Sequence, residues 1–398
     1  MLDGVRVLEL AACADAAPAA AYCARTLADL GADVIKIEPP EGDPLRGTPP
    51  FVDGVPGPDR GLTWIALNAN KRGVVLDRSS RDGERRFRAL VERSDAVITA
   101  DPSLDRSRLE AWNERAIVSI VTPFGASGPL AAARASDLEV TAASGSLWLA
   151  GEPGEAPVRT TLPQAWSWTG MYAAAGTLLA LLARERIGTG QTVDTSGQAS
   201  MATVHPPACV FWDVMREEHV RLGAHLLGRS IVGARFRNVW PCADGHVAFA
   251  IQGGPIGRHT MRELVSWMRE RDVVAPRLDA IDWDRFDNRT LTQDEVDALE
   301  AEVGTFLRTL TKREFFAGVV ARNMLGYPAS AAPDVYADEQ LRAREFWQRV
   351  PVPAAGCELP FPGGFATFDG ERPPIRRPPP RLGEHDAEVF AEIEARVR

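Results

Sequence analysis

Short apolar runs alternate with longer mixed segments through the first third of the chain. An Ala-rich segment at 16–30 and a charged segment at 80–93 are predicted helices. The apolar runs between them predict strands at 5–10, 34–37, 73–77, 96–99 and 117–121. This strand–helix–strand order indicates right-handed parallel crossovers, and therefore an α/β sheet.

Two further segments of this first region carry structural information. Residues 39–61 are dense in Pro, Gly and Asp, which predicts a loop after the second strand. Ligands of α/β proteins bind at the carboxyl ends of strands, so such a loop is a candidate for binding. Residues 169–186 are long and apolar, which predicts a buried helix ended by Gly188-Thr189-Gly190-Gln191.

The pattern changes near residue 225 and again near 326. Two short strands are predicted between 236 and 251, around the turn Ala243-Asp244-Gly245, followed by helices at 257–272, 293–309 and 312–322. From about 326 the chain is rich in Pro until a terminal helix near 384–396, and such a segment usually covers another surface. We therefore expect a large α/β domain at 1–225, a small α+β domain at 226–325, and a return segment at 326–398 that completes the large domain.

Composition narrows the class of protein. Of 398 residues, 45% are hydrophobic and 25% charged, which is ordinary for a globular protein, and the net charge of −9 argues against a nucleic-acid binder. No run approaches the roughly 20 apolar residues of a membrane span. The amino terminus lacks the layout of a secretion signal. Five scattered cysteines without Cys-x-x-Cys spacing, and six histidines without metal spacing, predict no disulfide and no metal site. We expect a cytoplasmic protein.

Five stretches carry a resemblance to a known family. They are residues 2–10; residues 27–40 with Gly42-Asp43 and Arg46; residues 67–73; the pairs Phe124-Gly125, Gly128-Pro129 and Thr169-Gly170 with 188–191; and Leu382-Gly383-Glu384-His385. In this order they resemble the class III CoA-transferases, which include formyl-CoA transferase, carnitine CoA-transferase and α-methylacyl-CoA racemase. The resemblance implies a Rossmann-like large domain built from both chain ends, a small domain between them, and two interlocked subunits. It also implies an acyl-CoA substrate and a carboxylic acid as its partner in the reaction.

The resemblance further implies a set of CoA-binding residues. Lys71 and Arg106 match positions that contact CoA in the family, and Arg46 belongs to its Gly-Asp-x-x-Arg pattern. Asn70 and Arg72 add polar and basic groups beside Lys71, where they could meet phosphates. The alternative is that Lys71 and Arg72 are solvated loop charges.

The chain also departs from the family's pattern. Ala100 and Asp101 stand where formyl-CoA transferase has an Asn-Phe pair near the adenine, and Pro39 replaces its arginine.

The largest departure is Trp166. Transferases of this family carry a nucleophilic aspartate at the aligned position, and an indole can neither attack a thioester nor accept a proton. The racemase's His-Asp pair aligns with Ser136-Asp137, so its histidine base is missing as well. Asp137 and Glu139 are candidate substitutes for a base or a nucleophile, and the alternative is that both are solvated or salt-bridged.

Three functions fit these observations. The chain could be the subunit without a nucleophile in a heteromeric CoA-transferase, paired with a sibling that keeps the aspartate. It could be an acyl-CoA isomerase, dehydratase or transferase that uses Asp137 or Glu139. It could also be a CoA-binding or regulatory scaffold without turnover. The first two are favoured because the CoA-side motifs are well kept, and the oligomer would be a homodimer or a heteromer.

Overall fold

The computed structural model describes residues 1–10, 14–204, 206–226 and 230–395. The chain divides into two compact units. The first comprises 1–147, 159–218 and 339–398, and the second comprises 148–158 and 219–338. The sequence analysis placed 148–158 in the large domain and set the outer boundaries at 225 and 325. In the structure the corresponding boundaries along the chain follow residues 218 and 338.

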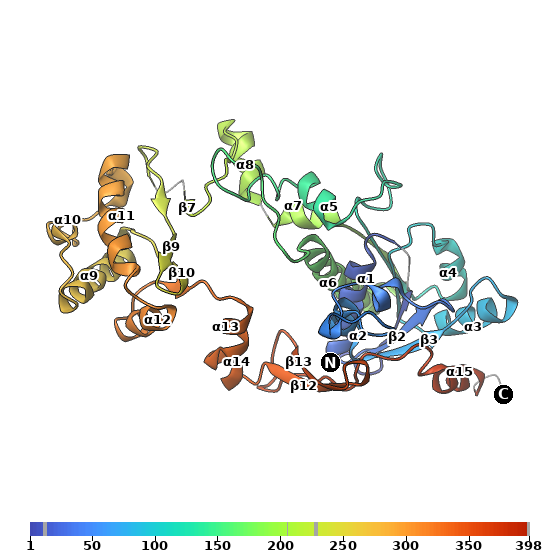
Figure 1. Ribbon diagram of the computed structural model, residues 1–398. Helices are drawn as coiled ribbons and strands as arrows, with labels where there is room; N and C mark the ends of the chain where they lie inside the picture. Colours follow the sequence, from blue (N-terminus) through green and yellow to red (C-terminus); the bar gives the residue numbers. More distant parts are fainter. Residues whose placement is uncertain (11–13, 205, 227–229, 396–398) are drawn as a thin grey trace. The chain divides into compact units, whose positions relative to one another are not determined.

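A six-stranded parallel sheet forms the centre of the first unit, in the order β3-β2-β1-β4-β5-β6 (Figure 1). The strands are β1 (Arg6–Leu10), β2 (Asp33–Glu38), β3 (Lys71–Val75), β4 (Ala96–Thr99), β5 (Ile117–Thr122) and β6 (Thr192–Ser196). Val, Ile and Leu dominate β1, β2, β4 and β5, which are buried on both faces, as parallel strands covered by helices must be. The predicted α/β sheet is therefore present.

Helices cover both faces of this sheet. One face packs against α1 (Ala17–Asp29) and α6 (Ala165–Ile187), and the other against α3 (Arg81–Val91), α4 (Arg106–Trp112) and α15 (Asp386–Glu394). The helices α1 and α6 approach closely at Gly170. A Cβ atom at this position would lie only 2.7 Å from the Ala19 carbonyl oxygen. The remaining helices of this unit are α2 (Leu62–Asn68), α5 (Asp137–Ala143), α7 (Gly197–Thr203), α8 (Pro206–Met215) and α14 (Glu339–Ala343).

The Pro-rich tail contains an element that the sequence analysis did not expect. The strands β12 (Trp347–Val352) and β13 (Cys357–Pro362) pair as an antiparallel hairpin. Prolines 351, 360 and 362 are tolerated because both strands of a two-stranded sheet are edges. Val350, Val352 and Phe361 of the hairpin pack with Trp64 and Ile65 of α2.

The tail then closes the edge of the main sheet. The His385 N–H donates to the Gly73 carbonyl at 3.0 Å, and the Gly73 N–H donates to His385 Nδ1 at 3.2 Å. The Val75 N–H donates to Asp386 Oδ1 at 2.8 Å. Figure 1 shows α15 beside β3, although more than 300 residues separate them in sequence. His385, the last residue of the Leu-Gly-Glu-His stretch, and Asp386 after it thus supply partners for an edge strand, whose free N–H groups would otherwise invite aggregation.

The second unit is a smaller α+β arrangement. Its strands are β7 (His225–Leu226), β8 (Phe236–Arg237), β9 (Val239–Cys242), β10 (Gly245–Ala248) and β11 (Tyr327–Pro328). Its helices are α9 (Gly254–Glu270), α10 (Pro276–Asp279), α11 (Gln293–Leu307), α12 (Lys312–Ala321) and α13 (Ala332–Ala337). Trp240, Trp267 and Phe306 lie in its core. Segment 148–158 belongs here because Arg221 lies 4.5 Å over the Trp148 ring and donates to the Trp148 and Glu155 carbonyls.

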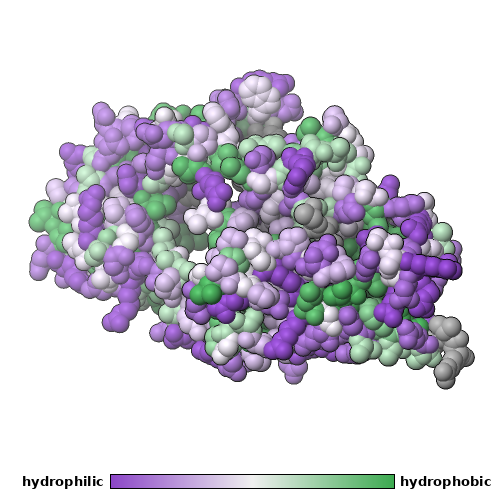
Figure 2. All heavy atoms as spheres, turned by 45° about the vertical axis from the view of Figure 1, so that its right-hand side comes forward, coloured by the Kyte–Doolittle hydropathy of each residue, from purple (hydrophilic) through white to green (hydrophobic). Residues whose placement is uncertain are grey.

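Apolar side chains are exposed on two helices of the first unit. Those on α6 are Met171, Tyr172, Leu179, Leu182 and Ile187, and those on α8 include Val210, Trp212, Val214 and Met215. Leu179 and Leu182 are each 66% exposed. Figure 2 shows that apolar patches lie among polar surface on the face seen there. Within the described part of the chain, no helix combines the length and apolarity needed to cross a bilayer.

We expect the contact between His385 and β3 to weaken in mild acid. Burial is the main cause that lowers the pKa of His385, and the positive charges of Arg377 and Arg72 lower it further. The negative charges of Glu384 and Glu388 oppose this change but do not outweigh it. A protonated imidazole cannot accept the Gly73 N–H. As pH falls, the histidine is therefore protonated in the unfolded chain before it is protonated in the folded chain. The stabilisation from the neutral imidazole is fully present above the ordinary histidine pKa of about 6.5, and it is lost as pH falls through the lowered pKa of the folded state.

Hydrogen exchange measured by mass spectrometry on peptides containing Gly73 and Val75 tests this expectation. Protection corrected for intrinsic rates should fall between pH 8 and pH 5. The His385→Gln variant, whose amide oxygen accepts at every pH, should lose the dependence. An unchanged dependence in that variant would assign the effect to neighbouring carboxylates instead.

Candidate functional site

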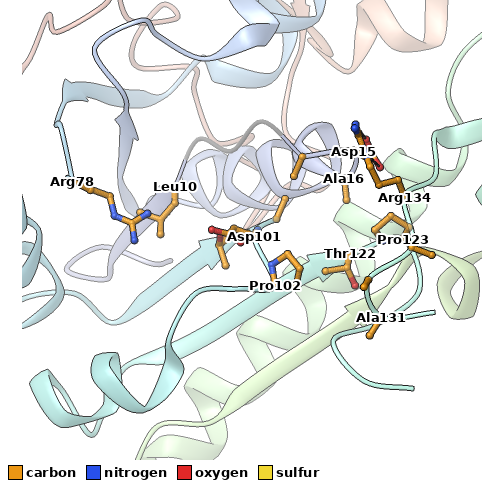
Figure 3. A pocket seen from close by; sticks show the side chains of 15 residues that line it. Leu10, Asp15, Ala16, Arg78, Asp101, Pro102, Thr122, Pro123, Ala131 and Arg134 are labelled. Carbon is orange, nitrogen blue, oxygen red and sulfur yellow. Dashed lines mark hydrogen bonds and ion pairs between the residues drawn. The ribbon is translucent and has the colours of Figure 1, made fainter. Parts of the chain in front are cut away.

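A cavity of about 510 Å³ lies at the carboxyl edge of the main sheet. It is lined at the ends of three strands by Leu10 of β1, Thr99 of β4 and Thr122 of β5. Leu10 and Thr122 are labelled in Figure 3. A second cavity of about 480 Å³ lies at the ends of β1, β2 and β3. The two cavities share Leu10 and Arg78 in their lining.

The strand order explains this position. From β1 the chain proceeds outward to β2 and β3, whereas β4, β5 and β6 follow on the other side of β1. The connections leave β1 and β4 towards opposite faces of the sheet, so a crevice forms between their carboxyl ends. Open α/β sheets bind ligands at this switch point.

Arg78 is the cation at the junction of the two cavities. It follows β3, its side chain is exposed, and its guanidinium lies 4.5 Å from the Phe87 ring centroid. Within the described part of the chain, its guanidinium makes no ion pair or hydrogen bond. The nearby carboxylates are engaged elsewhere, because Glu84 pairs with Arg108 and Asp101 accepts hydrogen bonds from Ser103.

Asp15 and Arg134 form an ion pair at the other end of the first cavity (Figure 3). Arg134 Nη2 lies 2.7 Å from Asp15 Oδ1, and Arg134 Nε lies 3.3 Å from Asp15 Oδ2. Asp15 also accepts the Ala135 N–H at 3.0 Å. The hydrogen bond from Arg134 is the main reason that the pKa of Asp15 is lowered. The pair joins the loop after β1 to the loop after β5.

Lys71 lies in a buried ionic network rather than at this edge. It begins β3, is fully buried, and its Nζ contacts Glu9 Oε2 at 2.6 Å, Asn68 Oδ1 at 3.0 Å and the Ala21 carbonyl at 3.0 Å. Lys36 Nζ binds the other Glu9 oxygen, Oε1, at 2.6 Å.

The two buried lysines differ in their protonation equilibria. Burial lowers the pKa of Lys71 to about 8, although Glu9 opposes the change. Burial also disfavours charge on Lys36, but Glu9, Asp43 and Glu38 outweigh it and raise the pKa of Lys36. The difference arises because Glu9, Asp43 and Glu38 all favour charge on Lys36, whereas the neighbouring cations Lys36 and Arg25 add to burial in disfavouring charge on Lys71.

The other predicted CoA-binding residues mostly have internal partners too. Arg72 pairs with Asp33, Glu388 and Glu392, and Arg46 pairs with Glu38 and Asp59 while stacking 3.7 Å over Trp64. Asn70 bridges Asp29 and the Arg376 N–H, each at 2.6 Å. Arg106 is exposed at the start of α4. By contrast, Ala100 and Asp101 line the first cavity and Pro39 lines the second.

The sequence analysis did not single out Arg78, yet a signal was present. It placed a strand at 73–77, so Arg78 was the first basic residue after it, at the carboxyl end where α/β proteins bind ligands. In the structure β3 spans 71–75, which puts Lys71 and Arg72 at the amino end of the strand, opposite the cavities.

Trp166 is the second residue of α6, which begins four residues earlier than predicted. Its side chain is 6% exposed and packs in the core with Val140 and Met201. A Cβ atom on Gly197 would lie 3.3 Å from the indole ring. The Trp166 N–H donates to Asp137 Oδ1 at 3.1 Å, which satisfies one of the unpaired amides at the start of α6.

The two candidate carboxylates, Asp137 and Glu139, belong to the first turn of α5. Glu139 is exposed and accepts the Ser136 N–H at 2.7 Å in a capping box, and hydrogen bonds from Ser136 lower the pKa of Glu139. Asp137 is half-buried and is the one that contacts Trp166. Among the described residues, no group of His, Cys, Asp and Glu side chains has the geometry to hold a metal ion.

Curated proteins and solved structures resemble the chain over nearly its whole length. It is 34% identical to subunit BbsE of succinyl-CoA:(R)-benzylsuccinate CoA-transferase from Thauera aromatica, over 93% of this chain and 90% of that one. It is 29% identical to the beta subunit of succinyl-CoA–L-malate CoA-transferase from Chloroflexus aurantiacus, over 98% and 94%. The crystal structure of a CAIB/BAIF family protein from Brucella suis matches with a TM-score of 0.79 and 26% identity, over 98% and 99%.

The family assignment is independent of any one relative. The profile of CoA-transferase family III matches residues 2–386, and every stretch that carried the resemblance lies inside that range. The chain therefore belongs to CoA-transferase family III.

Proposed function

We propose that the protein binds an acyl-CoA thioester at the carboxyl edge of its main sheet and acts as the subunit without a nucleophile in a heteromeric CoA-transferase. A sibling subunit would supply the attacking carboxylate, and the second substrate would be a carboxylic acid. The observation that carries the proposal is the buried indole of Trp166. The sequence analysis aligned this residue with the nucleophilic aspartate of the family's transferases.

The cavities support the binding of CoA. Coenzyme A carries several phosphate charges. Arg78, at the junction of both cavities, stacks on Phe87 but makes no hydrogen bond or ion pair among the described residues. Guanidinium groups bind phosphate with paired, charge-assisted hydrogen bonds. Arg106 is exposed on the neighbouring α4 and remains a candidate. The roles of Arg46, Asn70, Lys71 and Arg72 stay predictions, and their internal contacts favour a structural role.

The contacts of the candidate carboxylates support the absence of a nucleophile. Glu139 is exposed and is engaged in the capping box of α5. Asp137 holds the start of α6 through the Trp166 N–H. Both carboxylates therefore make structural hydrogen bonds, and these would be disturbed if either carboxylate attacked a thioester.

A partner subunit is supported by the exposed apolar side chains of α6 and α8. Contiguous exposed apolar surface marks sites of association in soluble proteins. Two of the relatives are named as subunits, BbsE and the beta subunit of the malate enzyme. A homodimer would cover the same surface, so the identity of the partner is a matter for experiment.

The second candidate function is altered acyl-CoA chemistry that uses Asp137. One observation favours it, because Asp137 is half-buried and directly contacts Trp166. A regulatory scaffold without turnover has no comparable observation in its favour.

Arg78 and Lys71 give a matched test of the CoA site. Each charge-assisted phosphate contact contributes roughly 1.5–3 kcal/mol, so Arg78→Gln should weaken CoA binding about ten- to a hundredfold and leave the melting temperature unchanged. Lys71→Met should instead destabilise the fold by about 3–5 kcal/mol, because Glu9 loses a buried partner. Titration calorimetry and thermal melting separate the two effects. A folded Lys71→Met protein that no longer binds CoA would instead support the CoA-binding role that the sequence analysis predicted for Lys71.

The chain alone should form no covalent intermediate. After incubation with acyl-CoA donors, intact-mass spectrometry should show no adduct, because Trp166 cannot attack a thioester. Trp166→Asp, which opens space in the core, is the matched variant in which an adduct could form. An adduct on Asp137 in the wild-type protein would favour the second candidate function. Transfer by the wild-type chain alone with ping-pong kinetics would contradict the proposal.

The exposed face of α6 should be needed for assembly. The double substitution Leu179→Asp and Leu182→Asp places charges where a partner would bury apolar surface. Analytical ultracentrifugation, alone and with a co-expressed sibling, should show loss of the oligomer while circular dichroism stays unchanged. Val274→Asp and Ile231→Asp, at exposed positions of the second unit, serve as controls. A wild-type chain that sediments as a monomer under both conditions would contradict the expectation.

A further inference from the structure

We propose that the carboxyl-terminal tail positions the second cavity for its ligand, because Arg46 joins the turn at 39–42 to tail residues 380–382. Docking of the tail and binding of a ligand in the second cavity then favour one another. This inference rests on the proposed function, since it concerns the regulation of the same site. It makes Arg46 a positioning residue rather than a direct contact of CoA.

Two segments form the walls of the second cavity. One comprises residues 38–41 at the end of β2, and the other comprises residues 76–79, which follow β3. The Leu76 N–H donates to the Glu38 carbonyl at 2.8 Å, so the two walls are joined where the strands end. None of the described tail residues lines this cavity. Any effect of the tail on a ligand there is therefore indirect.

Arg46 connects the first wall to the tail. Its Nε and Nη2 donate to the two carboxylate oxygens of the fully buried Glu38, at 2.7 and 2.6 Å, in a fork arrangement. Its Nη1 donates to the Pro380 carbonyl at 3.2 Å and also pairs with Asp59. The guanidinium stacks 3.7 Å over the Trp64 ring. These contacts hold the guanidinium in one orientation, so the tail carbonyl is fixed relative to the Glu38 carboxylate.

The turn at 39–42 packs against the same part of the tail. The Gly42 N–H donates to the Pro39 carbonyl at 2.9 Å, which closes the turn, and Gly42 has a φ of 83°, which favours glycine. A Cβ atom on Gly42 would lie 3.3 Å from Arg46 Cδ and 3.4 Å from Leu382 Cδ1. Both side chains therefore lie directly against the turn.

The tail also supports the second wall, through β3. His385 and Asp386 bind the backbone of this strand, and residues 76–79 follow directly after it. The docked tail thus contacts the supports of both walls. A ligand that requires both walls in place must stabilise the docked tail, and the docked tail must raise the affinity for that ligand by the same factor.

Hydrogen exchange measured by mass spectrometry on the full chain, with and without CoA, tests this coupling. CoA should slow exchange in peptides from 39–46 and also in peptides from 380–386, the latter by about five- to tenfold. The effect on the tail is the informative one. The described tail residues line neither of the two cavities, so CoA bound there would not cover them.

Three variants of the full chain address the join itself. Arg46→Gln should weaken CoA binding about five- to tenfold in titration calorimetry and abolish the slower exchange of the tail on CoA binding. Arg46→Lys, which keeps the charge but not the fork, should restore part of both. Leu382→Ala loosens the same contact without leaving a buried charge unpaired. It should act in the same direction even where Arg46→Gln fails to fold.

Arg60→Gln is the matched control. Arg60 donates to the Val52 and Val55 carbonyls of its own loop and to the Ala354 carbonyl beside the tail hairpin. Among the described residues, none of these hydrogen bonds reaches the turn at 39–42. Arg60→Gln should therefore lower the melting temperature, but leave the affinity for CoA and the slower exchange of the tail on CoA binding unchanged.

The possible outcomes separate the inference from the proposed function. Binding of CoA to the wild type without slower exchange in the tail would overturn the inference and leave the CoA site intact. An Arg46→Gln variant that loses affinity but keeps the slower exchange of the tail would also overturn it, because Arg46 would then contact a phosphate directly. So would a Leu382→Ala variant that matches the wild type in both measurements. Failure of the wild type to bind CoA would overturn the proposed function itself, and the inference with it.

Discussion

The carboxylate of Glu9, buried in the central strand β1, is the interaction on which the large unit depends. One of its oxygens binds Lys36 of β2 and the other binds Lys71 of β3. Lys71 also contacts α1 through the Ala21 carbonyl, and Lys36 contacts Asp43 in the loop after β2. A single carboxylate thus fixes three adjacent strands, a helix and a loop. Glu9 is the only carboxylate that pairs with Lys71 among the described residues, so removal of Glu9 would leave a buried charge without a counter-charge, which is strongly destabilising.

Local patterning was sufficient for most of the main sheet. Strands 96–99 and 117–121 were predicted to within a residue of β4 and β5, because fully buried parallel strands are continuous apolar runs. The hairpin β12–β13 was missed because its prolines argue against strands, and only the pairing partner shows that they occupy edges. The start of α6 was missed for a similar reason, since the amide of its second residue, Trp166, is satisfied by Asp137, which lies 29 residues away in sequence. Long-range partners are what a single sequence does not display.

The candidate site shows the same contrast between features that local sequence displays and features that depend on the folded structure. The family resemblance led to the conspicuous basic stretch at 70–72, which lies at the amino end of β3 and serves the core and the tail. The residue at the cavities, Arg78, stands outside any conspicuous motif and is distinguished by its place after the strand. Residue type alone could not separate these arginines and lysines, because burial and strand direction decide which of them meets a ligand.

The closure of β3 by the tail has a consequence for synthesis of the protein. The partners of Gly73 and Val75 are translated more than 300 residues after the strand itself. Until the tail is synthesised, the outer strand of the sheet therefore presents unpaired amides. Such an edge is open to other nascent chains and to chaperones. The time between synthesis of the strand and of its partners is thus a period in which correct assembly competes with aggregation.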